Sequence, residues 1–386
     1  MSNDAVIVSA VRTPVGIGKP EKGALSGVHP IDLSARVLQE VTGRIGLDPA
    51  LVDDVSWGAV SQVGEQSGNA ARNAVLSAGF PEDVTGVTID RQCGSSQQAV
   101  NFAAAGVIAG HHDIVIAGGV ESMSRVLMFT NMVGGDGPYP ASMHARYDGG
   151  LVNQGISAEM IAAQWGLSRT YLDELAAASH ERAAAAQAGG LFDEEIVTVD
   201  TPSGVVSLDQ GIRPGTTVES LAGLKTPFLE GGVVTAGNAS QISDGSAALV
   251  IMTSDRARQL GLKPLARIHT VAMAGVDPVI MLTGPIPATQ RALQRSGLAL
   301  SDIGAFEVNE AFASVLGAWY ADTGADPART NARGGAIALG HPLGASGARL
   351  MTTLVHRMRQ DGIRYGLQTM CEGGGMANAT ILELVE

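Results

Sequence analysis

The stretch VTIDRQCGSSQQAVNFAAAGVIAG, residues 87–110, changes its pattern at Cys93. The residues before Cys93 include several β-branched side chains, which indicate a strand, and those after it are small and apolar, which indicates a packed helix. Strand, sharp turn and helix in this order predict a βα unit with Cys93 in the turn. In α/β sheets such turns lie at the carboxyl ends of strands, where ligands bind.

A second stretch, GGAIALGHPLGASG at residues 334–347, surrounds His341 with five glycines. A surface histidine needs no such tightly folded loop, so we expect the backbone to hold this imidazole in a fixed place. A neutral imidazole could take the proton of Cys93 and later donate a hydrogen bond to an oxygen. The alternative is a structural histidine in a glycine turn.

The two stretches occupy corresponding positions of an internal repeat. Residues 51–61 and 300–309 both contain a turn with Asp followed by an apolar strand. The step of 248 residues that aligns these two Asp residues also leads from Cys93 to His341. The strand candidates ahead of the glycines at 118–119 and 373–375 correspond as well. Three matches in one register predict a duplicated half, with both reactive residues on equivalent loops.

Strand and helix candidates alternate along the chain, which predicts a mixed or parallel sheet covered by helices. We expect strands at 5–11, 86–89, 113–117, 247–253, 266–274, 304–308, 365–370 and 379–385, and helices at 31–43, 68–78, 95–109, 158–165, 171–188, 254–260, 288–296 and 346–360.

Residues 122–243 differ from the rest, because Gly and Pro interrupt them and few strands are expected there. We therefore expect an α/β protein of three parts. Residues 1–121 with 244–265 form an N-terminal core half that carries Cys93, 122–243 form an inserted loop domain, and 266–386 form a C-terminal core half.

Composition excludes several classes of protein. The chain has 25 Lys and Arg against 38 Asp and Glu, a net charge of −13, and no basic cluster that would bind nucleic acid. No apolar run approaches the ~18 residues that span a bilayer, and the N-terminus has no signal-peptide pattern. Two cysteines cannot form a disulfide framework. We expect a cytoplasmic protein that binds neither nucleic acid nor membranes.

Cys93 is the first candidate for chemistry. A thiol at a helix N-terminus lies at the positive end of the helix dipole, so we expect a lowered pKa and more thiolate. The small residues that follow, Gly94, Ser95 and Ser96, leave room for a ligand. The alternative is that Cys93 is a small buried apolar residue.

Two further candidates follow strands of the C-terminal half. Cys371 opens CEGGG, in which backbone N–H groups of the glycines could form an oxyanion hole, or else the glycines only form a bulge. Asn309 opens NEAFA, where its amide could orient a water or a substrate oxygen. It could equally cap the following helix.

The motifs of several enzyme classes do not occur. There is no CxxC, HExxH, GxxxxGK[ST] or GxSxG, and no GxGxxG between a strand and a helix. Zinc hydrolases, P-loop NTPases, serine hydrolases and Rossmann dehydrogenases therefore lose support. What remains is one His, two Cys and one Asn on glycine-rich loops, with no metal-binding pattern.

Together these motifs resemble the thiolase family, the acetyl-CoA acetyltransferases and 3-ketoacyl-CoA thiolases. The resemblance covers nearly the whole chain, with VRTPVG, RQCGSSQQA, AGGVESMS, AGNASQISDGSAA, GPIPA, NEAFA, GGAIALGHPLGASG and CEGGG in family order. It implies duplicated α/β halves in α-β-α-β-α layers with an inserted loop domain. It also implies an acyl-CoA C-acyltransferase, which cleaves 3-ketoacyl-CoA with CoA into acetyl-CoA and a shortened acyl-CoA, or runs the reverse condensation.

The resemblance also implies residue roles. Cys93 would accept the acyl group, His341 would activate it, and Cys371 would be the acid/base at the α-carbon. Asn309 would hold a water that forms one oxyanion hole with His341 Nε2. The N–H groups of Cys93 and Gly373 would form the second.

Coenzyme A would be a co-substrate, with no tightly bound cofactor and no metal. The inserted domain would bind it and also make oligomer contacts in a homodimer or homotetramer. The implied CoA contacts are Arg213 with the phosphorylated nucleotide, Phe228 and Phe312 with adenine or pantetheine, and Ala236 and Ser240 with the pantetheine amides. A solvated Arg213 is the alternative.

The chain departs from the family pattern at several positions. Gln97-Gln98 replace Leu or Met, which resembles the subgroup that handles bulky or ring-bearing acyl chains, and Asn153-Gln154 replace the His-Met of short-chain biosynthetic members. Arg333 stands near a common Asn, and Glu372 replaces an apolar residue. A carboxylate at Glu372 would disfavour thiolate at Cys371 if it turns inward.

Three alternatives stay open. The first is a biosynthetic acetyl-CoA acetyltransferase that makes acetoacetyl-CoA with the same residues. The second is a thiol redox protein that uses Cys93 and Cys371 as a pair, which leaves His341 and Asn309 without a role. The third is a catalytically idle acyl-CoA-binding member of the family.

Overall fold

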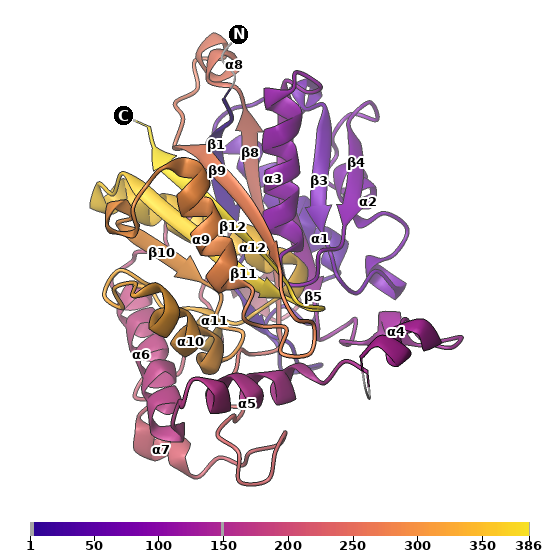
Figure 1. The fold of residues 1–386 in the computed structure, drawn as a ribbon. Helices are drawn as coiled ribbons and strands as arrows, with labels where there is room; N and C mark the ends of the chain where they lie inside the picture. Colours follow the sequence, from indigo (N-terminus) through magenta and orange to yellow (C-terminus); the bar gives the residue numbers. More distant parts are fainter. Residues whose placement is uncertain (1–3, 148–149, 386) are drawn as a thin grey trace.

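The computed structural model describes residues 4–147 and 150–385, in which a ten-stranded sheet is covered by helices (Figure 1). The strand order is β10-β11-β12-β9-β1-β8-β5-β3-β4, with β2 beside β8. The strands of this sheet are β1 Val6–Arg12, β2 Gly16–Ile17, β3 Asp54–Gly58, β4 Thr85–Ile89, β5 Ile114–Ser122, β8 Ser243–Met252, β9 Ala266–Gly275, β10 Ala305–Val308, β11 Tyr365–Glu372 and β12 Met376–Leu384. The α-helices are α1 Pro30–Gly43, α2 Ala70–Ser77, α3 Ser95–Ile108, α4 Ala141–Arg146, α5 Gln154–Gln164, α6 Arg169–Ala188, α7 Val218–Ala222, α8 Ser254–Gln259, α9 Pro285–Ser296, α10 Ala313–Thr323, α11 Ala336–Leu339 and α12 Leu343–Asp361.

The predicted duplication is confirmed in the strand order. The run β3-β5-β8-β1 in one half matches the run β10-β11-β12-β9 in the other. In each run the first pair is parallel and the next two pairs are antiparallel. The two halves join where β1 pairs with β9 over a short distance.

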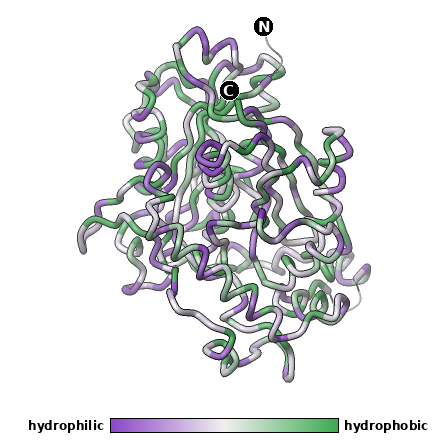
Figure 2. Tube along the Cα trace, turned by 90° about the vertical axis from the view of Figure 1, so that its left-hand side faces the viewer, coloured by the Kyte–Doolittle hydropathy of each residue, from purple (hydrophilic) through white to green (hydrophobic). Residues whose placement is uncertain are grey.

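The two halves of the sheet enclose the helices α3 and α12 between them, and further helices cover the outer face of each half, which gives five layers. On β5, Ile114 and Ile116 pack against the outer helices α1 and α2, whereas Val115 and Ala117 pack against α3 and α12. The other half packs its outer face on α9 and α10. The order α-β-α-β-α expected for the fold is therefore confirmed, and Figure 2 shows many apolar stretches in the interior and polar stretches in outer loops.

The central layer consists of one helix from each half, α3 and α12. They pack closely because Gly347 of α12 has no side chain, and a Cβ there would collide with the backbone of Gln97. At their N-terminal ends, a Cβ on Gly58 would lie 2.5 Å from both Gly344 O and Ser96 N. The beginnings of the two helices are thus neighbours.

Residues 123–242 lie between β5 and β8, and their described part supplies none of the strands of the main sheet. They contain the small β-hairpin of β6 (Val199–Thr201) and β7 (Gly204–Val206) and the helices α4 to α7, with α4 standing away from the body in Figure 1. We therefore propose the three-part division of the chain given above.

Several elements differ from the sequence expectation. Helix α10 (Ala313–Thr323) was not predicted, because residues 313–319 are buried all round and show no amphipathic period. Helix α5 begins at Gln154, four residues before its predicted start, since Asn153 caps it by accepting from Gly155 N at 2.8 Å. No helix in the described part of the chain is long and apolar enough to cross a membrane.

Candidate active site

Cys93 lies in a tightly held turn between β4 and α3. Ser95 Oγ accepts from Arg91 N at 2.9 Å, and Asp90 Oδ1 accepts from Gln92 N at 2.7 Å. Gln92 has a positive φ of 51°, a conformation that costs about 1–3 kcal/mol outside glycine. The surrounding bonds therefore hold Cys93 in a strained turn.

The expected low pKa of Cys93 is wrong. Burial is the main cause that raises this pKa to about 12, and the carboxyl groups of Glu372, Glu121 and Asp90 raise it further. The thiol is only 6% exposed, so loss of water outweighs the favourable helix dipole. Cys93 is therefore a protonated thiol at rest and needs a base to become a nucleophile.

His341 is held as a neutral imidazole. Its Nδ1 lies 2.6 Å from Ser346 Oγ, and that hydroxyl donates to Pro342 O at 2.9 Å. Because the hydroxyl hydrogen is used there, Nδ1–H donates to Ser346 and Nε2 carries the lone pair. Burial, with a smaller effect of Arg349, lowers the pKa of His341 to about 3.

The glycine before His341 explains the glycine-rich loop. Gly340 has a φ of 105°, which side chains rarely adopt, and a Cβ there would collide with Ser243 Oγ. The His341 backbone N donates to Gln241 O and to Ser243 Oγ, both at 3.1 Å. The loop thus aims the imidazole into the site.

Asn309 lies beside the imidazole, at the end of β10. Its Nδ2 is 3.4 Å from His341 Nε2, and its backbone N donates to Thr369 O at 3.1 Å. Asn309 Oδ1 is buried without a partner among the described residues, so a hydrogen-bond donor such as water is needed there. Asn309 does not cap α10, whose N-cap residue is Phe312.

Cys371 and Gly373 lie at the hairpin between β11 and β12. The pair Glu372 and Met376 closes a loop of three glycines, of which Gly374 and Gly375 have φ near 80°. Burial, followed by the nearby Cys93, raises the pKa of Cys371 well above its usual value. A Cβ built on Gly373 would lie 3.1 Å from Gln92 Oε1 and 3.5 Å from Gln154 Nε2.

These positions converge for a topological reason. Cys93 and His341 each stand two residues before a central helix, and the beginnings of α3 and α12 are neighbours. Asn309 and Cys371 stand at the carboxyl ends of β10 and β11, which are parallel partners. The structure therefore brings both thiols, the imidazole and the amide to one end of the central layer.

Of the residues expected to bind CoA, some lie together at the start of α10 and others are exposed on the surface. Phe228 and Phe312 meet edge to face with ring centroids 6.2 Å apart, and Ser240 N donates to Ala311 O at 2.9 Å. Arg213 is exposed and lies beside α6, where its backbone N donates to His180 Nδ1 at 3.1 Å. Ala236 is exposed in the loop before β8.

Sequence reasoning missed two supporting residues. Ser346 fixes the tautomer of His341, and its position in the first turn of a helix is the signal that could have revealed it. Glu121 is buried and accepts from Val60 N, Ser61 N and Gly344 N, so it anchors the start of α12. The signal in the sequence that could have revealed Glu121 is a single carboxylate within a largely apolar strand.

Two departures from the family pattern have structural explanations. Gln97 lies in the core between the halves, where it donates to Thr380 Oγ1 at 3.0 Å and accepts from Gln368 Nε2 at 3.0 Å. Its amide therefore joins the two halves of the chain. Arg333 donates to Leu191 O and to Gln360 Oε1, which ties the inserted segment to α12.

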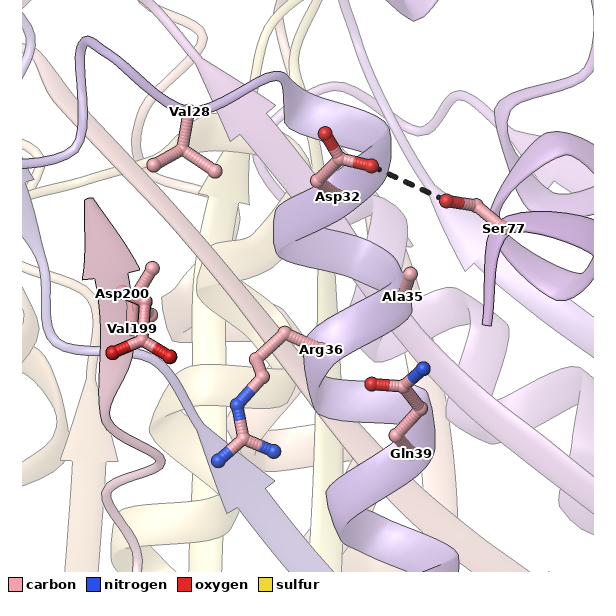
Figure 3. Close-up of a pocket in the computed structure, with 8 residues that line it drawn as sticks. All are labelled: Val28, Asp32, Ala35, Arg36, Gln39, Ser77, Val199 and Asp200. Atoms are coloured by element: carbon pink, nitrogen blue, oxygen red, sulfur yellow. Dashed lines mark hydrogen bonds between the residues drawn. The ribbon is translucent and has the colours of Figure 1, made fainter. Parts of the chain in front are cut away.

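A surface hollow lies elsewhere. The hollow drawn in Figure 3 has a volume of about 240 Å³ and is lined by residues of α1, β6 and neighbouring segments, among them Asp32, Arg36 and Asp200. None of the predicted site residues lines it. Within residues 4–147 and 150–385, no group of three His, Cys, Asp or Glu side chains is placed to hold a metal ion.

Comparison with known families agrees with this geometry. The model of the thiolase N-terminal domain matches residues 5–255, and that of the thiolase C-terminal domain matches residues 262–384. The chain belongs to the thiolase family. It is an α/β acyltransferase by fold and family.

Similar proteins span this thiolase end to end. It is 48% identical over 388 residues to the steroid 3-ketoacyl-CoA thiolase FadA6 of Mycobacterium tuberculosis, which covers 98% of this chain and 94% of the relative. It is 45% identical over 390 residues to a 3-ketoacyl-CoA thiolase of Erwinia tasmaniensis, which covers 98% and 99%. A crystal structure of the Bacillus anthracis acetyl-CoA acetyltransferase matches with a TM-score of 0.90, 38% identity and full coverage of both chains.

Proposed function

We propose that this thiolase cleaves 3-ketoacyl-CoA with CoA, giving acetyl-CoA and an acyl-CoA shortened by two carbons. The observation that carries the proposal is that a buried, protonated Cys93 and a neutral His341, whose Nε2 faces Asn309, stand at the neighbouring starts of the two central helices. With the imidazole as base, proton transfer from Cys93 gives the thiolate that covalent acyl transfer needs.

The first half-reaction uses three side chains. His341 Nε2 takes the Cys93 proton, and Cys93 Sγ attacks the 3-keto carbon. The tetrahedral oxyanion then collapses, the bond between C2 and C3 breaks, and its electron pair forms the enolate of acetyl-CoA. Cys371 Sγ–H protonates C2, which releases acetyl-CoA and leaves an acyl thioester on Cys93.

The second half-reaction restores all protons. The thiol of CoA gives its proton to the Cys371 thiolate, and the CoA sulfur attacks the acyl thioester. Cys93 leaves as a thiolate and regains its proton from the His341 imidazolium. Every group then returns to its starting state, which predicts ping-pong kinetics.

Two different negative charges need stabilisation in this sequence. Once protonated, His341 Nε2–H becomes a donor to the enolate oxygen, together with a water held by Asn309. The backbone N–H groups of Cys93 and Gly373 serve the tetrahedral oxyanion. We assign CoA binding to Phe228, Phe312 and Ser240, which lie together, with Ala236 and Arg213 in contact with more exposed parts of the molecule.

We infer that the preferred acyl chain is longer than that of acetoacetyl-CoA, and that ring-bearing chains are candidates. Gln154 approaches Gly373 from the segment where short-chain biosynthetic members carry Met, so the wall of the acyl site differs there. The two curated relatives named above are 3-ketoacyl-CoA thiolases, one of them of steroids, in line with this inference.

Intact mass after brief mixing with a 3-ketoacyl-CoA tests the function. We expect a mass gain equal to the shortened acyl group, located on the Cys93 peptide, and release of acetyl-CoA. Parallel mixing with acetoacetyl-CoA and with a long-chain 3-ketoacyl-CoA compares the two acylation rates. We expect the long-chain substrate to acylate Cys93 faster. Absence of an adduct from both substrates, with CoA still bound, would favour the idle family member.

We also propose that the protein is a homodimer or homotetramer. Exposed apolar side chains support this, with Leu127 and Phe129 each 55% and Val133 83% exposed in the segment near α4. We expect light scattering to give two or four times the chain mass of 39.5 kDa. Replacing Val133 and Phe129 by Ser should lower the mass if these residues form a contact, and a wild-type mass of 39.5 kDa would contradict the proposal.

We place its action in the cytoplasm. Cys93 and Cys371 are both free thiols that must stay reduced for the proposed mechanism, and a reducing compartment maintains them.

A further inference from the structure

Glu372 is a buried carboxyl group that the proposed mechanism does not use. It follows Cys371 on β11, and its side chain faces the central helices, where it is 0% exposed. The carboxyl group lies against Gly94, the residue after Cys93, so closely that a Cβ on this glycine would collide with Oε1. The carboxyl group of Glu372 and the nucleophilic turn are therefore in direct contact.

The surroundings leave this carboxyl group without a hydrogen bond. Neither oxygen has a hydrogen-bond partner in the described part of the chain. Its facing cation is Arg91, whose Nη1 lies 4.0 Å from Oε2 and whose side chain is 28% exposed. The amide of Asn378 flanks the same glycine and donates to Gly94 O at 3.4 Å. The charge of Glu372 also acts on the thiols of Cys93 and Cys371.

We propose that Glu372 is a positioning residue that sets how much of Cys93 is thiolate, with Arg91 as its counter-charge. The proposal rests on the role of Cys93 as nucleophile. In the neutral form, the Glu372 carboxyl group fills the space beside Gly94 without opposing a negative sulfur. In the ionised form, it places a second negative charge next to that sulfur and disfavours the thiolate.

The direction of the pH effect follows from burial. Burial raises the pKa of Glu372 to about 8, and Arg91 opposes part of this rise. Below pH 7 the carboxyl group is therefore mostly neutral, and above pH 9 it is mostly ionised. Two other carboxyl groups act on Cys93, and both are hydrogen-bonded: Glu121 accepts three backbone N–H bonds and Asp90 accepts one. Glu372 differs from them because it accepts none from the described residues.

Alkylation of Cys93 by iodoacetamide measures this effect without turnover. We expect Glu372→Gln to react at the wild-type rate at pH 6.5 and about three- to tenfold faster at pH 9.5, since one pKa unit corresponds to tenfold. Peptide mass spectrometry assigns the adduct to Cys93. Glu307→Gln is the matched control, because Glu307 is also buried without a hydrogen bond but is not among the groups that act on Cys93. It should leave the profile unchanged.

Arg91→Met is a second test variant, at a position that is more exposed than Glu372. Without the cation, the pKa of Glu372 rises, so the inhibiting charge should appear at a higher pH and alkylation at pH 9 should exceed the wild-type rate. Combined with Glu372→Gln, the Arg91 change should add nothing. Wild-type profiles from Arg91→Met, or superimposed profiles for Glu372→Gln and wild type from pH 6.5 to 9.5, would overturn the proposal. Since alkylation needs no acyl-CoA, a failure of thiolase activity is a separate result.

Discussion

A Cys93→Ala protein is expected to form no acyl-enzyme and to lose thiolysis by about 10⁴-fold or more. The sulfur is the atom that carries the acyl group in the proposed mechanism, so its removal abolishes the covalent intermediate. Intact mass after mixing with a 3-ketoacyl-CoA, together with steady-state release of acetyl-CoA, measures both losses.

The matched controls for this variant are stability and CoA affinity. Cys93 is a small buried side chain, and its removal leaves a cavity of one atom, so the protein should stay folded and bind CoA as before. Thermal unfolding and calorimetric CoA titration check these points. A folded Cys93→Ala protein that retains more than one per cent of turnover would rule out the acyl-Cys93 intermediate.

Replacing His341 by Ala is expected to lower kcat/KM for thiolysis by about 10³- to 10⁴-fold, because one side chain serves as base and as oxyanion donor. Ser346→Ala should cost about 10- to 100-fold, since it frees the Nδ1 proton without removing the imidazole. Both variants are compared by kcat/KM with the same 3-ketoacyl-CoA.

The pH profile separates this role from a structural one. The pKa of His341 is lowered to about 3, so the imidazole stays neutral and able to accept a proton down to about pH 4. Wild-type kcat/KM should therefore show no loss near pH 6.5, where an ordinary histidine protonates. A fall of wild-type kcat/KM centred at pH 6.5 would contradict a buried neutral imidazole as the base.

The sequence predicted the arrangement of the fold because its signals were local and repeated. Cys93 and His341 both lie in glycine-containing loops just ahead of a predicted helix, and the step of 248 residues joined them. Helix α10 escaped because burial on all sides removes the amphipathic period, so only tertiary packing reveals it.

The site, like the fold, was predicted only where the signal in the sequence is local. Its residue types were predicted, but the pKa of Cys93 was not, because helix position is readable from sequence while burial and nearby carboxyl groups are not. Whether Glu372 turns inward was equally unreadable: alternation fixes its face only once the pairing of β11 and β12 is known. Ser346 was missed because the partner of an imidazole depends on the path of the whole loop.

The close packing of α3 on α12 has a consequence for how the enzyme matures. The thiol and the imidazole come from opposite halves of the chain and become neighbours only where these helices touch, which requires the bare backbone of Gly347. Neither half can hold a working pair by itself. Catalysis therefore requires the two duplicated halves to dock, and the appearance of thiolysis reports that long-range step of folding.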